Sequence, residues 1–256
     1  MNKGQGDLVG MRQINWFKYS SPATFYPLAG KLIPYFAALA AALTVAGLYL
    51  GFFVAPTDYK QGEGYRIIFI HVPAAWMSMF IYVVMAAYAG MGLVFNTRLS
   101  SLMATALAPT GALFTFLALW TGALWGKPMW GAWWVWDARL TSELILLFLY
   151  IGFMSLKAAI DDPRRAARAS GLLAIIGVIN VPIIYKSVEW WNTLHQGATI
   201  KSSGTSMETT MLTAMLVMTL AMWMYTIAVV LARVRCEILE AERDTEWVAT
   251  ELGKSP

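Results

Sequence analysis

Long apolar runs alternate with short polar stretches along the whole chain. A helix needs about 20 largely apolar residues to cross the hydrocarbon core of a bilayer, and six stretches reach or approach that length. They are Leu32–Val54, Ile67–Phe95, Leu102–Trp120, Leu140–Ile160, Gly171–Lys186 and Thr209–Leu231. The fifth is the weakest, because it is short and contains Asn180 and Pro182. The pattern predicts an all-α integral membrane protein with six transmembrane helices.

The composition supports a membrane protein over a soluble domain. Of the 256 residues 58% are hydrophobic and only 13% are charged, whereas about 25% of residues are charged in a typical soluble domain. No short apolar core with a cleavage site precedes the first span, so we expect that span to remain in the mature protein. We divide the chain into an N-terminal segment (1–31), a six-helix membrane domain (32–231) and a C-terminal tail (232–256).

Basic residues are distributed unevenly between the two ends of the predicted spans. With six spans both termini lie on one side, which receives thirteen of the 19 Lys and Arg residues: Lys3, Arg12, Lys18, Lys31, Arg98, Lys157, Arg164, Arg165, Arg168, Arg233, Arg235, Arg243 and Lys254. The other side receives Lys60, Arg66, Lys127, Arg139, Lys186 and Lys201. Because cytoplasmic loops are enriched in Lys and Arg, we predict that both termini are cytoplasmic.

Tryptophan is concentrated between the third and fourth spans, in a predicted external segment at about 121–139. Half of the chain's 12 Trp gather there or just before it: Trp120, Trp125, Trp130, Trp133, Trp134 and Trp136. An aromatic belt at the membrane interface explains one or two Trp at a helix end, but six favour a surface for a flat aromatic ligand. If the segment is helical, Trp130, Trp133, Trp134 and Asp137 share one face.

The chain has only two histidines, and the predicted topology places both on the external side. His71 lies at the outer end of the second span, where Pro73 suits a first helical turn. His195 lies in the third external loop. A lone His near an interface is more often a hydrogen-bonded structural residue than a ligand. Two on one side, both beside Trp clusters, predict bis-histidine ligation of a haem iron.

Charged residues near the Trp-rich segment are candidates for further roles. The external cations that could hold haem propionates are Arg66, Lys127, Arg139 and Lys186, with Arg139 favoured because it follows the Trp run; snorkelling to the interface is the alternative for each. Asp137 either caps the fourth span or acts in the site. Glu143 either pairs with Arg139 or caps the helix start.

A resemblance follows from these motifs. Trp-Gly-x-x-Trp-x-Trp-Asp (130–137), followed by Ala-Arg-Leu-Thr, resembles the "WWD" signature of haem-handling proteins of cytochrome c maturation, and within them the chain resembles the CcmC family. The larger relatives CcmF and CcsA have more spans and more histidines. The resemblance implies that His71 and His195 are the axial ligands of a non-covalently bound haem b. The residues expected to contact haem are Trp125, Trp130, Gly131, Trp133, Trp134, Trp136, Asp137 and Arg139.

The same resemblance implies a cellular setting and partners. Haem would be bound at the periplasmic face of the bacterial inner membrane and delivered to the chaperone CcmE. The expected complex contains CcmA and CcmB, an ATP-binding cassette pair, and the small protein CcmD. No nucleic acid is expected among the partners.

The sequence contains no constellation that indicates catalysis. It has no Walker-type phosphate loop, so ATP dependence would come from another chain. Its single cysteine, Cys236, excludes an internal disulfide and a Cys-x-x-Cys site. We therefore expect no enzymatic activity. Two other functions stay open: an electron-transfer subunit of the b-cytochrome type, and a small-molecule secondary transporter, for which Pro109 and Pro182 fit broken helices.

Overall fold

The computed structural model describes residues 16–191, 193, 195, 200–201 and 204–253. The basic residues Lys3, Arg12 and Lys254 of the topology prediction lie outside these ranges. Six helices are long and apolar enough to cross a membrane: Pro22–Val54, Glu63–Phe95, Arg98–Trp130, Ala138–Ala159, Pro163–Trp190 and Thr209–Ala241. The predicted architecture of six transmembrane helices is confirmed.

The first two spans contain short turns of other helix types. A 3-10 turn η1 (Trp16–Tyr19) precedes α1 (Pro22–Tyr49), which ends in a π-helical turn η2 (Leu50–Val54). A second 3-10 turn, η3 (Glu63–Ile67), leads into α2 (Ile68–Phe95), and α3 (Arg98–Trp130) follows.

The remaining elements are α4 (Ala138–Ala159), α5 (Pro163–Gly177), α6 (Asn180–Trp190), the two-residue strands β1 (Ile200–Lys201) and β2 (Gly204–Thr205), α7 (Thr209–Ala241) and α8 (Glu246–Glu251). The strands pair antiparallel. Together α5 and α6 make the fifth span.

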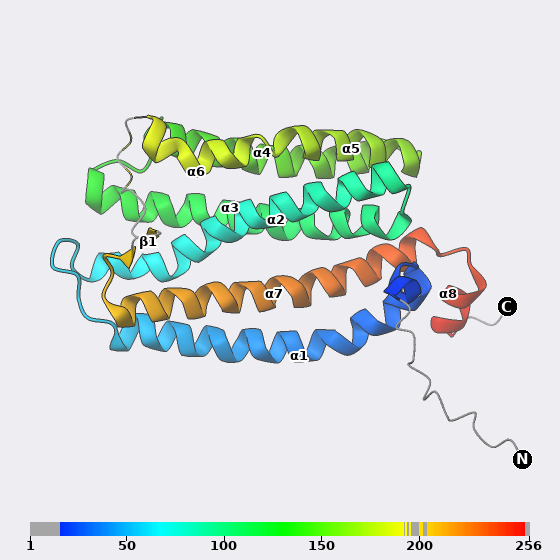
Figure 1. Ribbon diagram of the computed structural model, residues 1–256, viewed down its shortest axis with the longest axis horizontal. Helices are drawn as coiled ribbons and strands as arrows, with labels where there is room; N and C mark the ends of the chain where they lie inside the picture. Colours follow the sequence, from blue (N-terminus) through cyan, green and yellow to red (C-terminus); the bar gives the residue numbers. More distant parts are fainter. Residues whose placement is uncertain (1–15, 192, 194, 196–199, 202–203, 254–256) are drawn as a thin grey trace, which may run out of the picture.

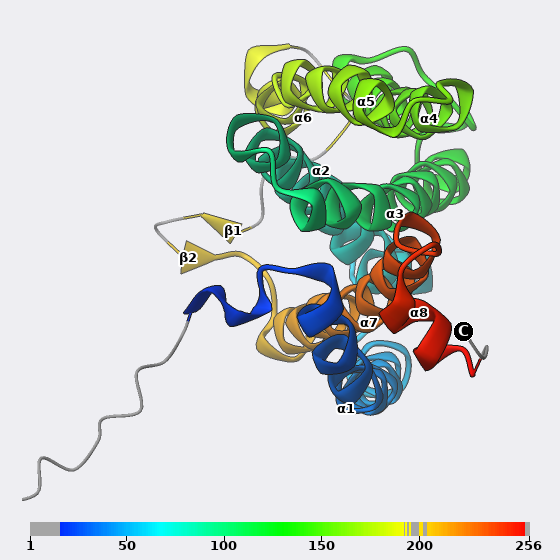
Figure 2. The ribbon, with the colours of Figure 1, turned by 90° about the vertical axis from the view of Figure 1, so that its right-hand side faces the viewer.

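The spans run side by side along the long axis of the molecule in three layers (Figure 1). The pair α1 and α7 forms one outer layer, α2 and α3 lie in the middle, and α4 with α5 and α6 forms the other outer layer. In the end-on view these layers are also separate (Figure 2). The start of α1 and the helix α8 lie at the same end, as an even number of spans requires. The opposite end carries the start of α2, the end of α3 and the start of α4.

The fifth span, the weakest by sequence, is broken in the middle. It is assembled from α5 and α6, and Val178–Ile179 lies between them. Gly177 at this break permits a close approach, since a Cβ there would lie 2.2 Å from the Tyr82 hydroxyl. The amide of Asn180 donates to the Ser142 carbonyl oxygen of α4 at 2.8 Å. The polar residue that weakened the prediction therefore ties two spans together.

The helices differ from the prediction around the Trp-rich segment. Since α3 continues to Trp130, the residues Trp120, Trp125 and Trp130 belong to a helix, and only 131–137 connect α3 to α4 without helix. Gly131 ends α3 in the left-handed conformation (φ 76°), which glycine adopts readily. Trp125 and Trp130, which were expected in the external segment at 121–139, therefore belong to α3 and not to a loop. The alternative, a helix over 130–137 with its Trp residues on one face, is also wrong, because 131–137 are not helical.

The start of α2 also differs from the prediction. Pro73 lies inside α2, which begins at Ile68 after the η3 turn. It is therefore not a first-turn residue. His71 instead occupies the first turn of α2, close to the end of α3.

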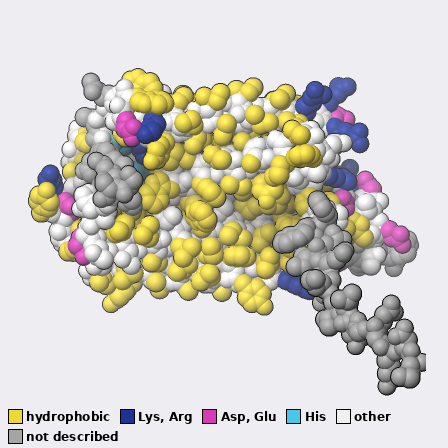
Figure 3. All heavy atoms as spheres, viewed as in Figure 1, with side chains coloured by type: hydrophobic (Ala, Val, Ile, Leu, Met, Phe, Trp, Pro, Cys, Tyr) yellow, Lys and Arg dark blue, Asp and Glu magenta, His cyan; other side chains and the backbone are white. Residues whose placement is uncertain are grey.

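Apolar side chains cover the middle of the molecule, and charged side chains gather at its two ends (Figure 3). Lys and Arg are most frequent at the end that carries the α4–α5 turn and α8. This is the surface of a multi-pass membrane protein, with an apolar band between two polar caps.

Candidate functional site

His71 is oriented by a residue that the sequence prediction missed. Its Nδ1 lies 3.0 Å from Thr121 Oγ1 on α3, and the Thr121 hydroxyl donates to the Leu117 carbonyl oxygen at 2.7 Å. Because that hydroxyl has a single proton, Nδ1 of His71 is the donor in the first bond. Its Nε2 is then unprotonated. Gly122 leaves room for the ring, since a Cβ there would lie 3.1 Å from Cε1 of the imidazole.

His195 is oriented in the same way by Asp137. Its Nδ1 lies 3.0 Å from Asp137 Oδ2, and the Thr193 hydroxyl donates to the same carboxylate oxygen. The backbone N–H of His195 donates to Thr193 Oγ1 at 3.1 Å. With Nδ1–H bound to the carboxylate, Nε2 of this second imidazole is also left unprotonated.

Asp137 caps α4, one of the two roles between which the sequence left a choice, and it also contacts His195. Its Oδ1 accepts the backbone N–H of Leu140 at 2.8 Å and so caps α4. Its Oδ2 holds His195. One carboxylate thus fixes the start of a transmembrane helix and the orientation of a histidine in a different segment.

The ionisation of this pair follows from its surroundings. Burial lowers the pKa of the His195 imidazole below its ordinary value, although the hydrogen bond to Asp137 opposes this. Burial alone would raise the pKa of Asp137. The hydrogen bonds from Thr193, from the Leu140 N–H and from His195 outweigh that effect, so its pKa is lowered. At neutral pH the site holds a neutral imidazole and a carboxylate, which is the pairing that supports a metal-bound histidine.

Two tryptophans connect the histidines. The His71 ring lies 6.4 Å from Trp125, Trp125 lies 5.7 Å from Trp130, and Trp130 meets His195 edge-on at 5.0 Å, measured between ring centroids. Trp125 is fixed by a hydrogen bond from its Nε1 to Gln61 Oε1 at 3.1 Å. Residues from α2, from α3 and from the segment after α6 therefore meet in one aromatic cluster that contains both imidazoles.

The other three tryptophans of the segment are arranged differently. Trp133 and Trp136 are 56% and 78% exposed. Trp134 is half-buried against Trp136 at 5.4 Å. Its Nε1 is buried and has no hydrogen-bond partner among the described residues. Gly131 has open space where a Cβ would be, so its role is the left-handed end of α3.

The four cations predicted to be external differ in what they already bind. Arg66 pairs with Glu63 and donates to backbone oxygens of η2 and Ala55. Lys186 pairs with Glu189 at 2.8 Å, and Lys127 donates to the Gly131 oxygen at 3.1 Å. Within the described part of the chain, Arg139 makes no direct hydrogen bond or ion pair. It is half-buried, and its charge acts on both histidines.

Glu143 does not serve as predicted. Its carboxylate is buried and accepts a hydrogen bond from Ser78 Oγ of α2 at 2.7 Å. No direct ion pair with Arg139 forms, and the helix cap is Asp137. The residues missed by sequence, Thr121, Thr193 and Ser78, are small hydroxyl residues without any charge or motif to single them out.

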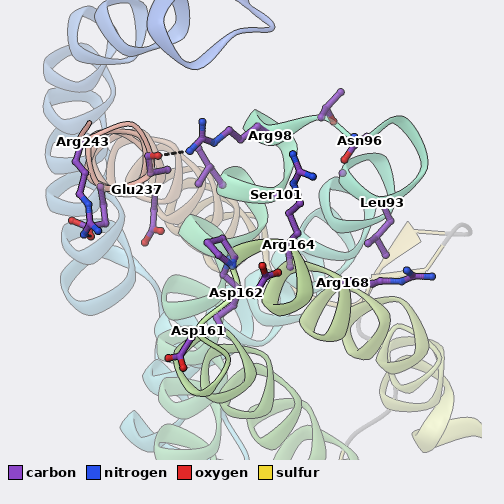
Figure 4. A pocket seen from close by; sticks show the side chains of 18 of the residues that line it. Leu93, Asn96, Arg98, Ser101, Asp161, Asp162, Arg164, Arg168, Glu237 and Arg243 are labelled. Carbon is purple, nitrogen blue, oxygen red and sulfur yellow. Dashed lines mark hydrogen bonds and ion pairs between the residues drawn. The ribbon is translucent and has the colours of Figure 1, made fainter. Parts of the chain in front are cut away.

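The large cavity of the molecule is elsewhere. It has a volume of about 1430 Å³ and opens at the opposite end (Figure 4), between the α2–α3 turn, the α4–α5 turn and the end of α7. Its labelled charged residues include Arg98, Asp161, Arg164, Arg168 and Glu237. No His, Trp or other aromatic residue lines it. The cavity is therefore separate from the histidine cluster.

Comparison with known proteins assigns the family. A family model described as "Heme exporter protein C" matches residues 15–249. The chain belongs to this family. Haem exporter protein C is a haem-handling component of cytochrome c maturation, with a role in transport and not in catalysis.

Individual haem exporter C proteins show the extent of the similarity. The protein of Escherichia coli (strain K12) is 57% identical over 178 residues, which cover 70% of this chain and 73% of the relative. That of Haemophilus influenzae is 47% identical over 236 residues, 90% of this chain and 94% of the relative. That of Bradyrhizobium diazoefficiens is 48% identical over 221 residues, covering 86% and 84%. The residues matched by the family model, 15–249, thus include all six transmembrane helices.

Proposed function

We propose that this haem exporter C protein binds one haem b non-covalently through His71 and His195 and delivers it to the chaperone CcmE. The observation that carries the proposal is the matched state of the two imidazoles. Each uses Nδ1–H in a hydrogen bond, to Thr121 and to Asp137 respectively, and each keeps Nε2 for a metal.

The surroundings of the imidazoles also suit haem. Trp125 and Trp130 present aromatic rings to a flat apolar ligand. Arg139 and the Trp134 N–H have no direct partner among the described residues, and both are donors that carboxylates accept well. We propose that they receive the propionates. Asp137 would keep the His195 tautomer fixed while iron is bound. Membership of the family favours this haem function over the cytochrome and secondary-transporter alternatives.

The proposed location is the periplasmic end of the bundle in a bacterial inner membrane. The support is the charge distribution: on the face shown in Figure 3, Lys and Arg gather at the end with the α4–α5 turn and α8, as they do at cytoplasmic ends. The histidine cluster lies at the opposite end. Both termini are then cytoplasmic, and CcmA, CcmB and CcmD would complete an ATP-driven complex with this chain.

Delivery requires that haem be held and then released. The two ligands come from separate segments, the first turn of α2 and the segment after α6, so one can be withdrawn before the other. Trp133 and Trp136 extend the aromatic surface to solvent, where a partner protein can reach it. Exposed aromatic residues are common anchors in protein interfaces.

Haem ligation is tested with the full-length protein purified in detergent. The parent should give a six-coordinate low-spin absorption spectrum. His71→Ala and His195→Ala should each give five-coordinate or weakly retained haem that added imidazole partly restores. Tyr59→Ala is the control, since Tyr59 is an 87% exposed aromatic residue that precedes α2. Six-coordinate spectra in both histidine variants would refute the assignment.

Delivery is tested separately by co-purification of haem and the chaperone. Trp136→Ala should keep haem bound but lower transfer, because Trp136 is exposed and outside the histidine–Trp cluster. The matched control is Trp120→Ala, a 56% exposed Trp stacked on Phe116 along α3. If the two variants transferred haem equally at equal membrane abundance, Trp136 would have no specific role in delivery. It would then be an interfacial anchor, as Trp120 is.

A further inference from the structure

Two helices that carry parts of the proposed haem site pack mainly on other helices and only weakly on each other. α2 carries His71 and packs mainly on α3, α5 and α7, whereas α4, which Asp137 caps, packs on α3, α5 and α6. In the end-on view α2 and α4 occupy diagonal positions (Figure 2). Close backbone packing between α2 and α4 therefore contributes little to the relative height of His71 and Asp137 along the bundle.

Side chains cross this diagonal at Ser78. The Ser78 hydroxyl donates to Glu143 Oε1 of α4 at 2.7 Å, and the Tyr150 hydroxyl of α4 donates to the Ser78 backbone oxygen at 2.8 Å. All three side chains are buried. Gly111 of α3 allows Tyr150 to pass, since a Cβ there would lie 2.2 Å from the Tyr150 hydroxyl. Ser78, Glu143 and Tyr150 are called the clasp below.

The spacing along each helix aligns the clasp with the haem site. Ser78 follows His71 by two helical turns, and Glu143 and Tyr150 are also separated by two turns, so each pair shares a helix face. Glu143 lies one turn after Arg139. The clasp is thus a direct link, inside the membrane domain, between the face of α2 that bears His71 and the helix that begins at Asp137.

The start of α4 is fixed from a third direction. Asn180 of α6 donates to the Ser142 carbonyl oxygen at 2.8 Å, and α6 leads to the segment that holds His195. A shift of α4 along its axis would therefore move Asp137, and with it His195, relative to His71. Among the described residues, the hydrogen bonds between α2 and α4 are those of the clasp. These bonds oppose such a shift from the α2 side.

We infer that Ser78, Glu143 and Tyr150 are positioning residues that set the separation of the two haem ligands. The inference rests on the proposed function, because it assumes that His71 and His195 bind one haem. None of the three residues is a ligand in the proposed haem site. Their contribution is to hold the two imidazoles at the separation that six-coordinate iron requires, and buried hydrogen bonds suit this because a broken one leaves an unsatisfied polar group.

Tyr150→Phe tests the inference in the full-length, haem-loaded protein in detergent. The variant keeps the ring and removes only the bond to Ser78. We expect haem loss to an excess of apomyoglobin to become about three- to tenfold faster, the effect of one buried hydrogen bond. The remaining haem should include a five-coordinate fraction, and its low-spin electron paramagnetic resonance signal should shift. Added imidazole should restore six-coordination.

Tyr82→Phe is the matched control. Tyr82 lies on α2 with its ring 5.0 Å from that of Tyr150, and its buried hydroxyl has no hydrogen-bond partner among the described residues. Removing it breaks no bond between α2 and α4. This variant should therefore match the parent in haem retention and in both spectra.

Two further substitutions separate hydrogen bonding from charge. Ser78→Ala removes the donor to Glu143 and should behave like Tyr150→Phe. Glu143→Gln keeps a side-chain oxygen that accepts from Ser78 and should behave like the parent. A Glu143→Gln spectrum as altered as that of Ser78→Ala would show that the charge matters and would overturn a hydrogen-bonded clasp.

Two other results would overturn the inference. One is parent-like haem retention and spectra in both Tyr150→Phe and Ser78→Ala. The other is a fall in membrane abundance with unchanged spectra of the haem that remains, which would show a purely structural role. The histidine variants distinguish these failures from failure of the proposed function, because a six-coordinate spectrum in His71→Ala and His195→Ala refutes the ligands themselves.

Discussion

Replacing Asp137 by Ala is the substitution for which the structure gives the clearest magnitude. The carboxylate accepts from the Leu140 N–H at 2.8 Å, from His195 Nδ1 at 3.0 Å and from the Thr193 hydroxyl. Loss of the helix cap costs about 1 kcal/mol of stability. Loss of a hydrogen bond to an ionised group costs about 1.5–3 kcal/mol.

These two losses act on different properties. The bond to His195 affects haem, and about 1.5–3 kcal/mol corresponds to roughly 10- to 150-fold in affinity. That range overlaps the loss of metal affinity, roughly 10- to 100-fold, that follows removal of a carboxylate hydrogen-bonded to a metal-bound histidine. The bond to Leu140 affects α4. Since α4 is a 22-residue apolar span, we expect it to insert normally without its cap.

The measurement compares Asp137→Ala with Asp137→Asn. Asn caps helices as well as Asp and can accept one bond from His195 without the charge, so haem release should be fastest for Ala and intermediate for Asn. Release is followed by absorption during transfer to apomyoglobin, and membrane abundance is measured in parallel. An Asp137→Ala protein that releases haem at the parent's rate would refute the role of Asp137 in holding His195.

Three further outcomes are expected. Reporter fusions within 161–168 should report a cytoplasmic location and fusions at Lys60 a periplasmic one. The reverse pattern would contradict the predicted topology. Thr121→Val, which is isosteric but cannot accept from the imidazole, should weaken haem ligation by His71 about tenfold, measured by haem release; an unchanged rate would contradict the tautomer assigned to that ring. Trp134→Phe keeps an aromatic ring but removes the buried N–H, so it should bind haem more weakly than the parent does. Haem dimethyl ester, which has no carboxylates, should bind equally well to the variant and to the parent. Equal loss for both ligands would exclude a propionate contact.

The parts of the structure that could be predicted from sequence depend on local properties. Six apolar runs predict six spans because the cost of placing a helix in hydrocarbon is a sum over consecutive residues. The same sum does not fix where a helix ends. Beyond the hydrocarbon Lys127 can continue α3 at little cost, and the helix stops only at Gly131, where a left-handed residue is available.

The site was predictable as far as rare residues mark it. The histidines and tryptophans are conspicuous in the sequence, and the structure brings His71, His195, Trp125 and Trp130 into one cluster. Thr121 and Ser78 are common residues, and their partners lie 50 and 65 positions away. Such hydrogen bonds exist only after the helices have packed. No local pattern could therefore identify them.

The length of α3 determines how far the proposed haem site lies from the hydrocarbon core of the membrane. A helix of 33 residues is about 50 Å long, whereas the hydrocarbon core is about 30 Å thick. If Arg98 marks the cytoplasmic boundary of the core, Trp120 lies near the outer boundary, and Trp130 stands about 15 Å above it. The haem that we propose to lie between Trp125 and the imidazoles would then be at the level of the lipid headgroups. Its apolar edge would remain in contact with acyl chains while its carboxylates reach water, so it could pass between bilayer and partner protein without dissolving in either bulk phase.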